Sequence, residues 1–262
     1  MTSLFDLDLR RQRRDRAARL GFETFLLERA FDDCIDRIGM VQRTFETALL
    51  VGCPDPSWPE RLNAVVSNVE VFDPGAILAS NAGGHQADER ELPVLPESYD
   101  LILAVGTLDS ANQLDEVFLR FRLALKPDGL LLGAMSGGET LPALRVAMRA
   151  ADEVMGSAAP HVHPRIAPAA LTGLLSSAGL KMPVVDVDRV RAAYPSLRRL
   201  LNDLRKMAAT NLLVQRSTRP ITKSAYQAAA AAFLECGDAG QTIETFEILH
   251  FAGWAPPTEQ AG

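Results

Sequence analysis

Short apolar runs that alternate with helix-like segments constrain the fold of this chain more than any other feature. The run from Tyr99 to Val105 is apolar apart from Asp100, which is typical of a strand buried on both faces of a parallel sheet. Comparable strands are expected at 47–51, 69–72, 130–134, 184–187 and around 243–251. Their alternation with helices predicts an α/β fold built on a doubly wound, mainly parallel sheet.

Apolar residues spaced three and four apart predict the helices. This spacing indicates helical structure within residues 1–45, and further helices are expected at about 60–66, 113–125, 140–154 and 168–178. The polar stretch 80–98 is rich in Gly and Pro, so we expect a long loop there with one weak strand at most.

A helical segment interrupts the second half of the chain. One stripe is formed by Leu197, Leu200, Leu201 and Leu204, and the helix is expected to point Arg198, Arg199, Asp203 and Arg205 mostly elsewhere. The alanine run 228–232 adds a second helix. The predicted organisation is a helical arm (1–45), one α/β domain (46–256) with a helical insertion at about 195–235, and a tail (257–262).

Composition excludes several classes of protein. At 262 residues and 47% hydrophobic the chain can bury a core, but no apolar run approaches the roughly 20 residues of a membrane span. The sequence therefore allows contact with a membrane surface but predicts no membrane-spanning segment. A net charge of −6 argues against nucleic-acid binding. Three scattered cysteines and no visible export signal predict a cytoplasmic protein. Oligomeric state has no signature in the sequence.

The N-terminal segment carries a dense arginine cluster: Arg10, Arg11, Arg13, Arg14, Arg16 and Arg19. One interpretation is a solvated helical face. A second is a basic arm that meets an acidic protein, membrane or RNA surface. A third is a helix packed on its own domain, with its arginines paired to surface acids.

The strand ends suggest a cofactor site, because ligands of doubly wound folds bind at the carboxyl ends of the strands. Asp73 ends the second expected strand 21 positions after Gly52, where its carboxylate could accept hydrogen bonds from the ribose hydroxyls of an adenosine. An ordinary turn or helix cap is the alternative. We predict Gly52, Cys53, Asp73 and Val105 as cofactor-binding residues. The loop after Gly52 is expected to leave little space for a ligand, because Trp58 follows it, and its two prolines remove backbone N–H donors.

Other candidate sites are weaker. The glycine-rich turn 133–140 lies at a strand end, where it could shape a substrate mouth or merely connect a strand to a helix. His161 and His163 lack the neighbouring cysteine or carboxylate that would complete a metal site, so no metal is predicted. No catalytic residue can be named.

Several segments resemble one known family: FDLDLRRQRRDRAA, YDLILAVGTL, LALKPDGLLLGAMSGGETLPALR, DVDRVRAAYPSLRRLLNDLRKMAATN and the closing GWAP. The chain is similar to bacterial relatives of mitochondrial complex I assembly factor 5, which are often labelled biotin-synthesis-like S-adenosylmethionine (SAM) methyltransferases. This resemblance implies a class I SAM-methyltransferase fold, adenosine held near Gly52 and Asp73, and a role in building respiratory complex I through a client protein, such as one of its subunits. The mitochondrial member is regarded as a protein-arginine hydroxylase, so the resemblance also leaves this activity open for the present chain.

Two departures from the family pattern leave two hypotheses. VGCPDPSW replaces the glycine-rich cofactor loop, and Leu108, Asp109 and Ser110 stand where many members have a His-Trp pair. Either the chain is a SAM-dependent enzyme that modifies its client, or it is a catalytically inactive, methyltransferase-derived factor that binds its client through the basic arm and inserted helices.

Overall fold

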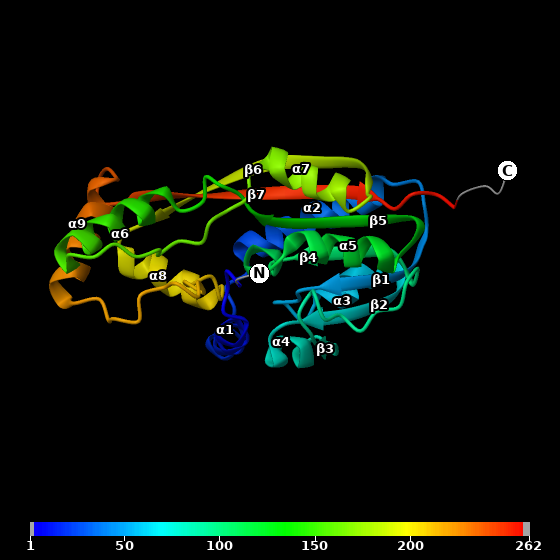
Figure 1. The fold of residues 1–262 in the computed structure, drawn as a ribbon, viewed down its shortest axis with the longest axis horizontal. Helices are drawn as coiled ribbons and strands as arrows, with labels where there is room; N and C mark the ends of the chain where they lie inside the picture. The colour runs from blue at the N-terminus through cyan, green and yellow to red at the C-terminus, as the bar shows by residue number, and fades with distance from the viewer. Residues whose placement is uncertain (1–2, 259–262) are drawn as a thin grey trace.

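The computed structural model describes residues 3–258 and confirms the doubly wound α/β fold (Figure 1). One seven-stranded sheet has the order β3-β2-β1-β4-β5-β7-β6, and β7 is its antiparallel strand. The strands are β1 (Phe45–Val51), β2 (Val66–Asp73), β3 (His85–Gln86), β4 (Tyr99–Val105), β5 (Leu125–Ser136), β6 (Lys181–Tyr194) and β7 (Thr242–Trp254).

Helices cover both faces of the sheet. One face packs against α2 (Phe25–Met40) and α3 (Trp58–Asn63), and the other against α5 (Leu114–Ala124) and α7 (Pro168–Ser177). Successive residues of a strand point to opposite faces. In β4, Leu101, Leu103 and Val105 therefore join the first layer, whereas Ile102 and Ala104 join the second. This explains why β4 is apolar from Leu101 to Val105.

A third apolar cluster, beyond the two layers on the sheet, lies at the far end of β6 and β7, toward the left of Figure 1. It joins α6 (Pro142–Met155), α8 (Leu197–Lys206) and α9 (Lys223–Glu235). Leu197, Leu200 and Leu204 are buried there as predicted, and Leu201 is half-buried. The expectation that Asp203 points away was wrong, because its side chain is buried beside Arg199.

Three elements differ from their predicted bounds: β6, α4 (Ala76–Asn81) and α3. Strand β6 is far longer than the predicted 184–187. The sequence pattern predicted only part of it, because β6 is an edge strand in which polar residues interrupt the apolar ones. The predicted loop 80–98 does contain the weak strand β3, preceded by an unpredicted helix α4 (Ala76–Asn81). Helix α3 starts earlier than predicted, with a proline in its first turn.

The N-terminal helix α1 (Leu7–Leu20) packs beside α4 and α8 (Figure 1). Asp6 caps it by accepting a hydrogen bond from the backbone N–H of Leu9. Among residues 3–258, no helix is both long and apolar enough to cross a membrane. The predicted domain boundaries stay predictions, and residues 259–262 of the predicted tail lie outside the described part of the chain.

Candidate functional site

The predicted cofactor residues meet at the carboxyl end of the sheet, where the strand order reverses between β1 and β4. Gly52 follows β1 with a positive φ of 87°, and its N–H donates to the carbonyl of Phe72. A Cβ at Gly52 would overlap the carbonyl oxygen of Val105 and the side chain of Thr107, so glycine permits the close contact between these strand ends. The crevice in which doubly wound folds hold ligands is therefore packed by the chain itself.

Asp73 is fully buried and fully hydrogen-bonded. Oδ1 accepts from Nε of Arg14 at 2.8 Å and from the N–H of Gly75 at 2.7 Å. Oδ2 accepts from Nη2 of Arg14 at 2.5 Å and from the N–H of Cys53 at 3.0 Å. A carboxylate offers about four lone-pair sites, and these four donors use them all. No acceptor remains for the ribose hydroxyls that the sequence assigned to Asp73.

Arg14 comes from α1, as does Arg10 one turn earlier. Arg10 is 1% exposed and forms a two-point contact with Glu89, at 2.6 and 2.9 Å, while also donating to Asp88 at 3.1 Å. Burial raises the pKa of Glu89, but attraction and hydrogen bonding from Arg10 outweigh it and hold that pKa at about 2. The carbonyls of Gly106 and Thr107 accept the remaining bonds, from Arg14 at 2.9 Å and from Arg10 at 2.8 Å.

These contacts support the third interpretation, a helix packed on its own domain, except that the acids paired with Arg10 and Arg14 are buried rather than at the surface. Arg10 and Arg14 are buried, so they are neither a solvated face nor free to dock elsewhere. Arg13 donates to Thr210 and to the carbonyl of Asn211, within the same chain. Exposed arginines of α1 are Arg16 and Arg19.

Helix α1 occupies the acceptors that a nucleoside would use here. It places three guanidinium groups on the three carboxylates at the crevice, Asp73, Asp88 and Glu89, and a nucleoside bound to these carboxylates would have to displace them. The side chain of Trp58, which was expected to take up space in the site, is instead fully buried and stacks on Phe31, with 4.2 Å between the ring centroids. The side chain that occupies Asp73 is thus Arg14 of α1, not Trp58.

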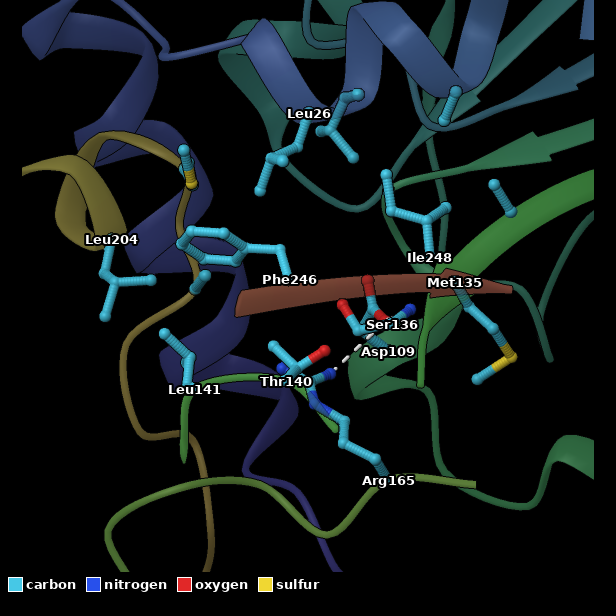
Figure 2. A pocket seen from close by; sticks show the side chains of 16 residues that line it. Leu26, Asp109, Met135, Ser136, Thr140, Leu141, Arg165, Leu204, Phe246 and Ile248 are labelled. Atoms are coloured by element: carbon cyan, nitrogen blue, oxygen red, sulfur yellow. Dashed lines mark hydrogen bonds and ion pairs between the residues drawn. The ribbon is translucent and has the colours of Figure 1, made fainter. Parts of the chain in front are cut away.

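A cavity of about 80 Å³ lies beside this crevice, at the carboxyl ends of β4 and β5. Its walls are mainly apolar, with Leu26 and Leu27 from α2, Leu204 from α8, and Phe246 and Ile248 from β7. Figure 2 shows the polar side chains of Asp109, Ser136, Thr140 and Arg165 gathered at one side of the cavity. Part of the glycine-rich turn thus does line a cavity, as the substrate-mouth interpretation of 133–140 requires.

The two histidines expected not to bind metal make separate contacts. His161 pairs with Asp152 at 2.8 Å. Nε2 of His163 accepts the N–H of Leu212 at 2.8 Å, and burial lowers the pKa of His163 to about 3. Across residues 3–258, no group of three or more His, Cys, Asp or Glu side chains could hold a metal ion.

The fold and the position of this crevice define a class I methyltransferase-type domain. A family model described as "Methyltransferase domain" matches residues 22–183. The YcgJ protein of Bacillus subtilis superposes with a TM-score of 0.58 at 10% identity, covering 87% of this chain and 99% of its own. A Haemonchus contortus phosphoethanolamine N-methyltransferase 2 in complex with SAM gives a TM-score of 0.52 at 14% identity, covering 86% of this chain and 52% of its own.

Sequence comparison narrows the class. Arginine-hydroxylase NDUFAF5 of Danio rerio is 34% identical, covering 99% of this chain and 85% of that protein, and the Homo sapiens protein is 31% identical, covering 99% and 79%. Malonyl-[acyl-carrier protein] O-methyltransferase of Xylella fastidiosa is 35% identical, covering 66% of this chain and 57% of that protein. The chain belongs to the methyltransferase-domain family that includes NDUFAF5.

Proposed function

We propose that this chain is a methyltransferase-derived assembly factor that binds a client protein, a subunit of respiratory complex I, without transferring a methyl group. Membership of the NDUFAF5 family supports the assembly role. One observation carries the absence of methyl transfer: Arg14 and two backbone N–H groups use every acceptor site of Asp73, the residue expected to hold adenosine.

The rival function is SAM-dependent modification of the same client. It is favoured by the convergence of Gly52, Cys53, Asp73 and Val105 at the point where this fold holds nucleosides, and by solved neighbours that contain SAM. Under this rival, α1 would have to leave the crevice before SAM could bind.

Calorimetry with SAM and S-adenosylhomocysteine separates the two functions. We expect no binding heat from the wild-type chain up to about 1 mM ligand, the upper end of ordinary substrate affinities. Binding with a micromolar Kd would contradict the proposal. The Arg10→Gln/Arg14→Gln double variant then shows what excludes the nucleoside: binding by this variant assigns the exclusion to α1, and its absence assigns it to the loop after Gly52.

The client requires a separate experiment. Deleting the gene for this chain should lower NADH:quinone oxidoreductase activity in membranes, together with the amount of assembled complex on native gels. Complementation with the wild-type gene should restore both. Unchanged activity in the deletion strain would show that the client is not a subunit of complex I. A cytoplasmic location is part of this proposal and is checked by fractionating the same cells.

A further inference from the structure

Residues 189–223 carry a charge opposite in sign to that of the rest of the protein. They include nine Lys or Arg side chains and one acidic side chain, that of Asp203, which is buried. Their net charge is therefore +8 in a chain whose total is −6, so the other residues together carry −14. The segment comprises the end of β6, the whole of α8 and the connection from α8 into α9. A basic surface thus stands on an otherwise acidic protein.

Helix α8 presents its basic side chains on one side. Its apolar stripe is buried inside the protein, so the opposite side of the helix faces solvent. That side carries four cations, which we call the α8 basic face: Arg198, Arg199, Arg205 and Lys206. The three arginines are exposed and Lys206 is half-buried. Arg198 and Arg205 are seven residues apart, as are Arg199 and Lys206, so the four side chains form two neighbouring rows.

Few acids compensate these cations. Arg199 lies 3.5 Å from Asp203, and within the described residues 3–258 no ion pair involves Arg198, Arg205 or Lys206. Arg198 and Arg199 also lie in the first turn of α8, which contains no acidic residue, although the dipole of a helix disfavours cations at that end. The α8 basic face therefore has an electrostatic cost that a negatively charged partner would relieve.

The basic surface continues onto α1, which packs beside α8 (Figure 1). The N–H of Glu23, shortly after the end of α1, donates to the carbonyl of Lys206 at 3.3 Å, so the carboxyl ends of the two helices meet. Arg19 lies in the last turn of α1 and is exposed. Arg19 therefore adds a cation next to the α8 basic face.

We propose that the α8 basic face, together with Arg19, is a docking surface for an acidic helix of another protein. Guanidinium groups form two-point contacts with carboxylates, as Arg14 does with Asp73 inside this chain. Cations seven residues apart on α8 match acids at the same spacing on a partner helix. The inference deepens the proposed function, because it names the surface by which an assembly factor would hold its client, and it rests on that function only for the identity of the client.

Two other kinds of polyanion fit this surface less well. A helix that binds a membrane surface inserts its apolar face into the lipid, but the apolar stripe of α8 is buried inside the protein. Proteins that bind single-stranded RNA stack its bases on aromatic side chains, and the α8 basic face has none. The acidic remainder of the chain would also repel an extended polyanion. Carboxylates of a compact protein partner are the anions that remain.

A synthetic peptide tests the surface. Three repeats of Glu-Ala-Ala-Glu-Ala-Ala-Ala place the carboxylates on one face of a helix. Fluorescence anisotropy with the full chain should show binding at about 0.01 M NaCl that weakens severalfold at about 0.15 M, because the screening length falls from about 30 Å to about 8 Å. The same peptide with Gln in place of Glu should not bind. Absence of binding by the Glu peptide, or equal binding of both peptides, would overturn the proposal.

Two double variants with the same change in net charge locate the binding. Arg198→Gln/Arg205→Gln should weaken binding of the Glu peptide about fivefold, the combined contribution of two exposed ion pairs. Arg43→Gln/Lys181→Gln should leave it unchanged, because both side chains are exposed near the opposite ends of the strands. All four positions are exposed, so both variants should keep the wild-type melting temperature. Equal weakening by the two variants would show that net charge alone attracts the peptide and would refute the docking surface.

Phosphatidylglycerol vesicles and oligouridylate test the other partner classes. Neither should bind more tightly than the Glu peptide at about 0.15 M NaCl. Tighter binding of either one, lost in Arg198→Gln/Arg205→Gln, would assign the α8 basic face to a membrane or to RNA and overturn the proposal. These measurements involve neither SAM nor complex I. A deletion strain that loses complex I, combined with a chain that does not bind the peptide, would therefore keep the proposed function and reject this surface.

Discussion

Replacing Arg14 by Gln tests whether α1 is part of the folded core. Breaking a buried ion pair by removing one partner typically costs 3–5 kcal/mol, because the other charge stays buried without compensation. In this protein Asp73 would keep the N–H groups of Cys53 and Gly75, at 3.0 and 2.7 Å. We therefore expect the lower end of that range, a loss of about 3 kcal/mol in the free energy of unfolding.

Urea unfolding followed by circular dichroism measures this loss. Arg16→Gln is the matched control, because Arg16 lies on the same helix but is exposed, and such surface changes stay within about 0.5 kcal/mol. The Arg14→Gln/Asp73→Asn double variant should lose less than the sum of the two single variants, since it leaves no unpaired charge. If Arg14→Gln and Arg16→Gln are equally stable, Arg14 does not anchor α1, and the N-terminal helix regains the role of a free basic arm.

Two further predictions concern stability. Burial, followed by repulsion from Arg165 and Arg13, holds the pKa of His163 at about 3, below its ordinary value of 6.5. The unfolded chain therefore binds the proton first, and His163 should make the free energy of unfolding fall by about 1.4 kcal/mol per pH unit as the pH drops from about 6.5 toward 3; urea titrations of His163→Gln across this range should lack that contribution, and an unchanged slope would contradict it. Leu200→Ala should lower the free energy of unfolding by about 2–5 kcal/mol because Leu200 is fully buried. Leu201→Ala should lower it less, because Leu201 is half-buried. Thermal melts in which Leu201→Ala is the less stable variant would contradict the packing of α8.

Sequence reasoning succeeded where a residue's neighbours are set by the regular geometry of its own element. Strand β4 was predicted with its observed bounds because both of its faces are buried. The meeting of Gly52 and Asp73 followed from the rule that parallel strands end at one edge of the sheet. Strand β6 was underestimated because only one of its faces is covered, so its pattern alternates.

Contacts between distant segments were not predictable in the same way. Arg10 and Arg14 are one helical turn apart, which places them on one face, but nothing local shows that this face meets Asp73, Asp88 and Glu89, some 60 to 80 residues later. Asp88 and Glu89 were placed in a loop and given no role. Arg165 has no distinguishing pattern in the sequence, because its contact with Asp109 is visible only in three dimensions.

The stability of the arginine pairs also sets how weakly SAM should bind. A nucleoside at Asp73 would have to displace Arg14, and one that extended to Glu89 would displace Arg10 as well. If releasing each arginine costs as much as removing it, about 3 kcal/mol, the open state lies about 6 kcal/mol above the closed one, which reduces the apparent affinity by a factor of about 10⁴. A site with an intrinsic Kd near 1 μM would then show a Kd of about 10 mM, beyond the range of the calorimetry. The two experiments therefore constrain each other. If Arg14→Gln costs less than about 1 kcal/mol, α1 opens too easily to exclude SAM, and a failure to bind SAM would have to come from the altered loop after Gly52.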